Sequence, residues 1–103
     1  MRAIYITDLS GHAGESVTLK VWTANKRSGK GIYFIILRDG TGFCQCVVDE
    51  KQVAAGDFEN AGKLTMESSC IISGKVVKDE RQIGGYELQA TQVSIISIAE
   101  EYP

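Results

Sequence analysis

Residues 32–48 read IYFIILRDGTGFCQCVV, two apolar runs joined by a short polar segment. Both runs are rich in the β-branched and aromatic residues that are enriched in strands. The segment between them, Asp39 to Gly42, supplies the Asp and Gly residues of a tight connection. We therefore predict a β-hairpin with strands over 32–38 and 43–48.

The register of this hairpin decides which side chains face outward. If Arg38 pairs with Phe43, antiparallel pairing places Phe34 opposite Val47. Gln45 lies two residues before Val47 on the same strand, so it becomes a diagonal neighbour of Phe34, roughly 7 to 8 Å from it. The other face would carry a set suited to a core: Tyr33, Ile35, Leu37, Cys44, Cys46 and Val48. We therefore expect the face with Phe34 and Gln45 to be the exposed one.

Three further strands are predicted around the hairpin. Apolar and polar residues alternate from Val17 to Val21, which predicts a first strand that ends in a polar turn over 25–31. Two later runs, 70–77 and 86–98, are rich in β-branched residues and predict the last two strands.

One short helix is predicted between the third and fourth strands. Val53, Ala54, Phe58 and Ala61 recur at roughly helical spacing, and Gly62 is a plausible C-terminal stop. Three strands, a helix and two strands is the element order of the oligonucleotide-binding (OB) fold. We therefore predict an all-β fold, a five-stranded OB-fold barrel whose second and third strands form a binding face.

The composition is that of one globular domain. Hydrophobic residues make up 44% and charged residues 23%, and no apolar run is long enough to cross a membrane. No signal-peptide pattern is present. We expect a single domain over 1–103, with 1–16 as an N-terminal lead-in, in a soluble cytoplasmic protein that does not bind a membrane.

The charge is unevenly distributed along the chain. The formal net charge is -2, whereas nucleic-acid-binding domains usually have a basic balance. From Ser16 to Arg38, however, there is no acidic residue, and this stretch holds five basic ones: Lys20, Lys26, Arg27, Lys30 and Arg38. One basic face on an acidic protein is therefore expected.

An exposed phenylalanine beside a glutamine and a basic turn is suited to single-stranded nucleic acid. The ring stacks on a base, the amide reads the base edge, and the cations meet phosphates. The alternative is that Phe34 only covers the mouth of the barrel and that the basic residues form a solvated turn. The residue pattern alone leaves both interpretations open.

Catalytic and metal chemistry have little support in this sequence. His12 is the only histidine, and no nucleophile lies at a recognisable spacing from it. The three cysteines, Cys44, Cys46 and Cys70, lack the repeated paired spacing of a zinc site, so we interpret them as small core residues. We expect no catalytic site, metal or cofactor in this chain.

Motifs along nearly the whole chain resemble the anticodon-binding domain of the class IIb aminoacyl-tRNA synthetases, the aspartate, asparagine and lysine enzymes. The motifs are Val21-Trp22, Arg27-Ser28-Gly29-Lys30, Phe34-Ile35, Leu37 to Gly42 with Gln45, Glu67-Ser68-Ser69, Gly84 to Leu88, and 99–103. The last of these resembles the start of the linker to a catalytic domain. Val21 departs from the family, which usually has glycine before this tryptophan.

The resemblance implies a role for several side chains. Phe34 matches the aromatic residue that stacks on the central uracil of the anticodon, and Gln45 and Arg27 match the residues that hydrogen-bond that base. Glu87 matches a carboxylate near the wobble base. Three lysines would meet phosphates: Lys26, Lys30 and Lys78.

The resemblance also implies partners. The partner is the anticodon loop of a tRNA, and ATP and Mg²⁺ are expected only in the catalytic domain, which this chain lacks. The isolated domain is expected to be monomeric, and the parent enzyme a homodimer through its catalytic domain.

Three alternatives remain open from the sequence. Within the family, the turn at Arg38 to Gly42 and the segment Gly84 to Leu88 look more like asparagine enzymes than bacterial aspartate or lysine enzymes. Archaeal-type aspartate enzymes are the nearest alternative. A free-standing barrel that binds RNA or single-stranded DNA, and a protein-interaction barrel, are the other two.

Overall fold

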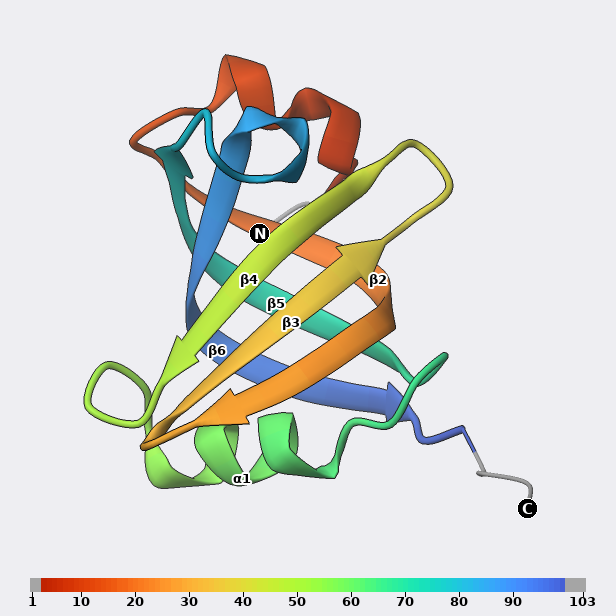
Figure 1. Ribbon diagram of the computed structural model, residues 1–103. Helices are drawn as coiled ribbons and strands as arrows, with labels where there is room; N and C mark the ends of the chain where they lie inside the picture. Colours follow the sequence, from red (N-terminus) through yellow and green to blue (C-terminus); the bar gives the residue numbers. More distant parts are fainter. Residues whose placement is uncertain (1–2, 100–103) are drawn as a thin grey trace.

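The hairpin predicted from residues 32–48 is present, with β3 over Ile32–Arg38 and β4 over Phe43–Asp49. Arg38 pairs with Phe43 and Phe34 with Val47, so the predicted register is confirmed. The computed structural model describes residues 3–99 (Figure 1). The predicted linker over 99–103 therefore lies outside the described residues, except for Ala99.

Four more strands, one α-helix and two short 3-10 helices complete the described part of the chain. They are β1 (Ala3–Ile4), η1 (Ile6–Gly11), β2 (Ser16–Gly29), α1 (Ala55–Lys63), β5 (Ser69–Lys78), η2 (Ile83–Gly85) and β6 (Tyr86–Ser97). The strand order is β1-β2-β3-β4-β6-β5, and β2 also pairs with β5, which closes the sheet. The five strands β2 to β6 thus form a closed barrel with one short helix, and the predicted OB fold is confirmed.

The prediction for the first strand was wrong at its C-terminal end. The residues 25–31 were expected to form a turn, but β2 continues to Gly29. Its first half pairs with β5 and its second half pairs with β3, with a bulge between Thr23 and Asn25. Polar side chains are tolerated in the second half because most of them lie on the solvent side of the barrel wall, where a strand needs no apolar residue.

The predicted helix exists, but its limits differ from those expected. Val53 and Ala54 precede it, and Gly62 lies within its last turn rather than after it. A Cβ atom at Gly62 would lie 2.7 Å from the hydroxyl oxygen of Tyr33. Gly62 therefore permits close packing of the helix on the barrel instead of ending the helix.

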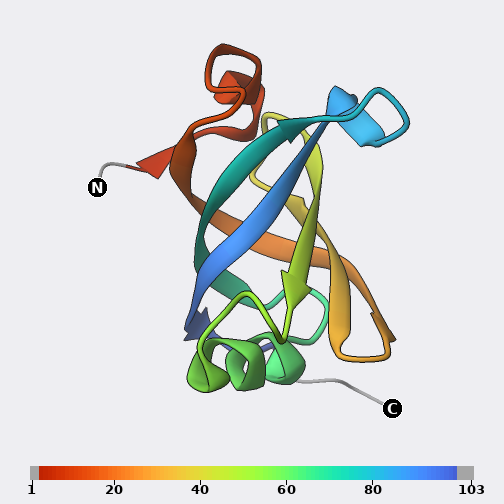
Figure 2. The same ribbon diagram turned by 90° about the vertical axis from the view of Figure 1, so that its left-hand side faces the viewer.

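The two ends of the barrel are covered by different elements. Helix α1 lies across one end, and η1 lies at the opposite end, as Figures 1 and 2 show. Ala61 and Leu64 are buried at the first end, and Ile6 and Leu9 of the lead-in are buried at the second. Sequence patterns predicted neither β1 nor η1 in this lead-in.

The three cysteines are part of the hydrophobic core. Cys44, Cys46 and Cys70 are fully buried, together with residues such as Leu19, Ile72 and Leu88. Burial raises the pKa of Cys44 from 9.0 to about 12 and that of Cys70 to about 11, and it raises the pKa of Cys46 well above its ordinary value. The interpretation of the cysteines as core residues is confirmed.

We expect these thiols to stay protonated and unreactive toward Ellman's reagent in the folded protein at pH 8. In guanidinium chloride all three should react, because unfolding restores an ordinary pKa. A raised folded-state pKa also means that the contribution of these thiols to the free energy of unfolding is fully present well below pH 9.0 and is lost as the pH rises above that value. Fast labelling of native protein would contradict this assignment.

Gly74 on β5 is required by the close approach of β6. A Cβ atom at this position would clash with the carbonyl oxygen of Gln89 and lie 2.9 Å from its carbonyl carbon. We expect Gly74→Ala to lower the free energy of unfolding by about 1–3 kcal/mol, as overpacking does. Gly56→Ala in α1, where a Cβ meets nothing within 4 Å, is the control and should not destabilise. Chemical denaturation measures both, and equal stabilities would contradict the prediction.

Candidate nucleic-acid interface

One continuous row of side chains crosses the outside of the barrel at Phe34. Arg27 on β2 pairs with Phe34 on β3, and Phe34 pairs with Val47 on β4. Val47 pairs in turn with Gln89 on β6, and Gln89 with Lys75 on β5. Directly paired residues point to the same side of a sheet. We call these five residues the Phe34 row.

A second row runs parallel to the first, two residues along each of the central strands. Asn25 pairs with Ile36 and Ile36 with Gln45. Gln45 pairs with Glu87, and Glu87 with Val77. We call these five residues the Gln45 row. Phe34 and Gln45 therefore are diagonal neighbours on the outer face, as predicted.

The Phe34 ring is held by an arginine beside it. The Arg27 guanidinium carbon lies 4.8 Å from the ring centroid, which is within the range of a cation–π contact. Phe34 is half-buried and Arg27 is exposed. The pair therefore provides a planar apolar surface with a cation next to it, which suits a stacked base with its phosphate.

The Gln45 amide is oriented by Glu87. Gln45 Nε2 donates to Glu87 Oε2 over 3.3 Å, although the two residues are far apart in sequence. A carboxylate only accepts hydrogen bonds, so it holds the amide with its NH₂ group toward β6. The amide carbonyl and its second N–H then remain for the edge of a base.

Lys26, one of the three lysines predicted to meet phosphates, does not lie on the outer face. Lys26 pairs with Ile35, a core residue, so it lies on the inner face. Its ammonium donates to the carbonyl oxygens of Ala61 and Gly62, over 3.2 and 2.9 Å. The structure therefore does not bring Lys26 to the Phe34 row, because the C-terminal carbonyls of α1 attract it.

Lys78 and Lys30 lie at the two ends of this region. Lys78 pairs with Tyr86, and both residues point to the same side of the sheet as core residues of their strands. The ammonium of Lys78 is 4.0 Å from the carboxylate of Glu80. It belongs to neither row. Lys30 is exposed in the turn between β2 and β3, beyond Arg27. The predicted basic face is thus reduced mainly to Arg27 and Lys30.

Arg38 is engaged in another cluster. Its guanidinium forms an ion pair with Glu67 and lies 5.3 Å from the centroid of the Trp22 ring. Trp22 is 42% exposed, while its neighbour Val21 is buried. Arg38 is therefore satisfied locally and contributes little to the charge of the outer face.

Sequence reasoning missed two members of the Phe34 row, Lys75 and Gln89. Their position depends on the pairing of β4 with β6 and of β6 with β5, which includes a bulge between Ser73 and Gly74. No local pattern fixes that register. Only the polar character of alternate residues in β6 was a signal that could have pointed to Gln89.

Residues 3–99 contain neither a cluster of metal-binding side chains nor a membrane-spanning helix. No group of three or more His, Cys, Asp and Glu side chains there is placed to hold a metal ion. No helix in that part of the chain is long and apolar enough to cross a membrane.

The fold and the outer face together define a class of protein. The family model described as an OB-fold nucleic acid binding domain, of the tRNA anticodon type, matches residues 17–96. The chain belongs to this family.

Asparagine–tRNA ligases are among the relatives of this chain. The chain is 50% identical over 98 residues to the asparagine–tRNA ligase of Roseiflexus castenholzii, a match that covers 95% of the chain and 22% of that protein. The chain therefore spans about a fifth of the length of such relatives. The predicted resemblance to the class IIb synthetases is confirmed, and it includes asparagine enzymes that match nearly the whole chain.

Solved structures agree with this comparison. The asparaginyl-tRNA synthetase of Pyrococcus horikoshii, complexed with asparaginyl-adenylate, superposes with a TM-score of 0.89 at 33% identity, over 100% of this chain and 24% of that chain. The aspartyl-tRNA synthetase of Entamoeba histolytica has a TM-score of 0.84 at 26% identity, over 100% and 23%. The aspartate alternative is thus not favoured.

The position of Lys26 generates a prediction about stability rather than binding. We expect Lys26→Met to lower the free energy of unfolding by about 1–2 kcal/mol, because two helix carbonyls lose a charged donor. RNA affinity should change no more than in Lys63→Met, a control on the exposed side of α1. Denaturant titration and an RNA-binding isotherm test this, and a binding loss specific to Lys26→Met would contradict it.

Proposed function

We propose that this chain binds the anticodon loop of a tRNA as the anticodon-binding domain of an asparagine–tRNA ligase. The observation that carries the proposal is the diagonal placement of Phe34 and Gln45 on one outer face. Arg27 lies against the ring and Glu87 against the amide. The asparagine–tRNA ligase relatives, which match nearly the whole chain, support the choice of enzyme.

The central base of the anticodon would occupy the space over Phe34. Its ring would stack on Phe34, and the Gln45 amide would both donate to and accept from the edge of a uracil. Arg27 supplies a cation at the side of the ring. A cytosine presents the opposite donor and acceptor pattern at its edge, so the oriented amide would discriminate against it.

The neighbouring base on the β6 side would meet Glu87. A carboxylate accepts hydrogen bonds from the ring and amino N–H groups of guanine. Because Glu87 also holds Gln45, recognition of the two bases would be coupled. Lys30 in the exposed turn would contact phosphate and position the loop without reading its sequence.

The aminoacylation reaction belongs to the remaining length of the relatives. The chain spans 22% to 24% of those proteins, so we propose that ATP, Mg²⁺ and the amino acid bind in a catalytic domain outside this sequence. In this proposal the parent enzyme forms a cytoplasmic homodimer through that catalytic domain. The domain described here binds the anticodon loop of the tRNA.

We expect Phe34→Ala to weaken binding of a stem-loop with the anticodon GUU by about 1–3 kcal/mol, through loss of stacking. Wild-type protein should bind a GCU stem-loop more weakly than GUU at the same salt concentration. A titration followed by NMR measures both and shows whether Phe34, Gln45 and Arg27 shift.

Tyr5→Ala is the matched control, because Tyr5 is 62% exposed and belongs to neither row. It should bind both stem-loops like the wild type. Equal affinity of the wild type for GUU, GCU and unrelated single strands would instead indicate a general single-strand binder. Unchanged affinity in a folded Phe34→Ala protein would contradict the proposal.

A further inference from the structure

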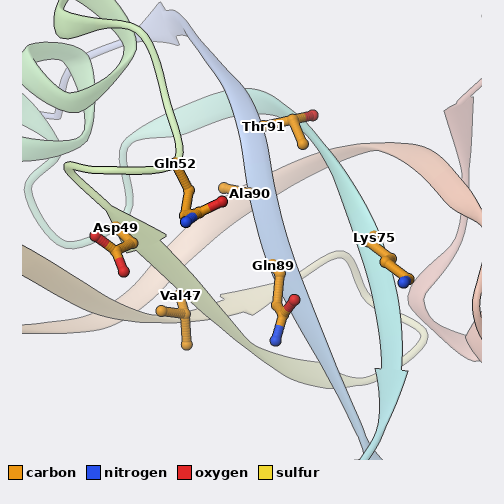
Figure 3. A pocket seen from close by; sticks show the side chains of 7 residues that line it. All are labelled: Val47, Asp49, Gln52, Lys75, Gln89, Ala90 and Thr91. Atoms are coloured by element: carbon orange, nitrogen blue, oxygen red, sulfur yellow. The ribbon is translucent and has the colours of Figure 1, made fainter.

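Exposed apolar side chains gather on one side of the barrel, away from the Phe34 row. The pocket of about 500 Å³ beside that row has a mainly polar lining, which includes Asp49, Gln52 and Lys75 (Figure 3). A different pocket, of about 400 Å³, shares no lining residue with it and lies over β1, β2, β5 and β6. Four large apolar residues that are 38% to 62% exposed lie at or beside this second pocket, and we call them the Trp22 patch: Tyr5, Trp22, Ile71 and Ile96.

Strand pairing brings the Trp22 patch together. Trp22 and Lys20 lie two residues apart on β2, so they point to the same side of the sheet. Ile71 of β5 is the direct partner of Lys20, which makes it a diagonal neighbour of Trp22. Tyr5 lines the pocket together with Lys20 and Trp22. A single apolar side chain on a surface is ordinary, whereas a group of them marks an interaction site.

Ile96 reaches this side of the sheet through a bulge in β6. Ile95 pairs with Cys70 and Ser97 pairs with Ser69, so Ile96 is the extra residue. A bulge redirects a side chain that regular alternation would place differently. Ile96 is 46% exposed and lines the pocket. The core gains nothing from an exposed isoleucine, so the bulge adds apolar surface to the Trp22 patch.

The Trp22 ring is held in place by a charged pair. The Arg38 guanidinium carbon lies 5.3 Å from the ring centroid, and Arg38 forms an ion pair with Glu67. Glu67 has a φ of 68°, in the left-handed region that residues with a side chain rarely adopt, and its backbone N–H donates to the Thr23 carbonyl oxygen over 2.7 Å. Strained backbone of this kind is concentrated at functional sites. A ring that is already oriented loses little entropy when a partner covers it.

The polypeptide leaves the barrel beside the Trp22 patch. Ser97 ends β6 and pairs with Ser69, which lines the pocket. Two residues later, the Ala99 N–H donates to the Ser68 hydroxyl over 3.1 Å, and the Thr65 hydroxyl donates to the Ala99 carbonyl oxygen over 2.7 Å. Figure 1 shows the end of β6 beside the connection from α1 to β5. A segment that follows Ala99 therefore starts next to the patch.

We propose that the Trp22 patch is the docking surface for the catalytic part of the same parent polypeptide. The inference rests on the proposed function, which makes this chain one domain of a longer ligase. The match to the relatives covers only 22% and 24% of two of them, so most of their length lies outside it. A domain tethered near Ala99 is at high effective concentration beside the patch, so a small apolar contact is enough to hold it.

The chemistry of the patch defines the surface that it fits. The partner surface is apolar and carries an acidic side chain opposite Lys20. Lys20 lies at the edge of the pocket, is exposed, and forms no ion pair with another residue of the described range 3–99. A carboxylate of the docked domain would pair with it and fix the register of the contact. Because β2 carries Trp22 in one half and Arg27 in the other, docking here would fix the direction in which the anticodon site faces relative to the catalytic domain.

The test compares side-chain oxidation by hydroxyl radicals in the isolated chain and in the full-length parent ligase. Labelling of Trp22 and Tyr5 should be about fivefold lower in the parent, because the centre of an interface excludes water. Phe43 is the matched control, since it is an aromatic residue outside the patch that is 46% exposed. Its labelling should be equal in both proteins. Equal labelling of Trp22 in both proteins would overturn the proposal.

A charged substitution in the patch gives a second readout. Ile71→Glu places a charge in the patch, and Lys63→Glu at an exposed position of α1 is its control. In the parent, Ile71→Glu should restore Trp22 labelling toward that of the isolated chain and raise the KM for tRNA about tenfold, as loss of an interface contact does. Lys63→Glu should change neither. In the isolated chain, Ile71→Glu should bind the GUU stem-loop like the wild type, and a nitrogen–proton NMR spectrum checks that the barrel is intact.

Other occupants of the patch would give different results. If the isolated chain self-associates and thereby protects Trp22, a second copy covers the patch and the proposal is overturned. If a folded Ile71→Glu chain loses affinity for the stem-loop, the patch is an RNA surface and the proposal is likewise overturned. The anticodon function is tested separately by Phe34→Ala. If that variant binds normally, the proposed function fails, while Trp22 labelling still decides whether the patch is a contact between domains.

Discussion

The structure depends on one strand that pairs with two partners. β2 bonds to β5 along Ser16–Trp22 and to β3 along Trp22–Gly29, and the bulge after Thr23 lets it bend between them. This double pairing closes the sheet and leaves β1 as a short strand at the outside of β2. Since a closed barrel has an inside and an outside along every strand, alternate side chains of each strand fill the core. The outer face is then free to carry polar and aromatic groups.

The parallel pairing of β4 with β6 makes a site out of that outer face. Without it, the outer face would consist of residues from β2, β3 and β4 alone. The amide of Gln45 would then have no partner to orient it. Pairing places Glu87 directly beside Gln45 and Gln89 beside Val47. The carboxylate fixes the amide, which reduces the entropy lost when a base binds. A connection between distant segments therefore fixes the orientation of a half-buried glutamine on the outer face.

Residue patterns predicted the features that neighbouring residues determine. They failed where pairing between distant segments determines the position of a side chain. A turn at Asp39 to Gly42 fixes the register of β3 and β4, so the shared face of Phe34 and Gln45 could be read directly. Lys26 was placed with the cations of the outer face because its neighbours are basic. Its orientation follows from the bulge in β2 and from the helix carbonyls, neither of which a pattern shows. The role of Glu87 came from the family resemblance, and Lys75 and Gln89 depend on the β5–β6 bulge.

An acidic domain that binds RNA must obtain its selectivity from bases rather than from charge. Lys26 and Arg38 are occupied within the protein, and the outer face retains Arg27, Lys30 and Lys75. Three phosphate contacts on a single strand give a salt slope of only about 2, so nonspecific attraction is weak. Stacking contributes about 1–3 kcal/mol per base and depends on an unstacked loop. The low charge therefore favours binding of a loop with splayed-out bases and disfavours duplex RNA, because a duplex offers phosphates but no accessible base faces.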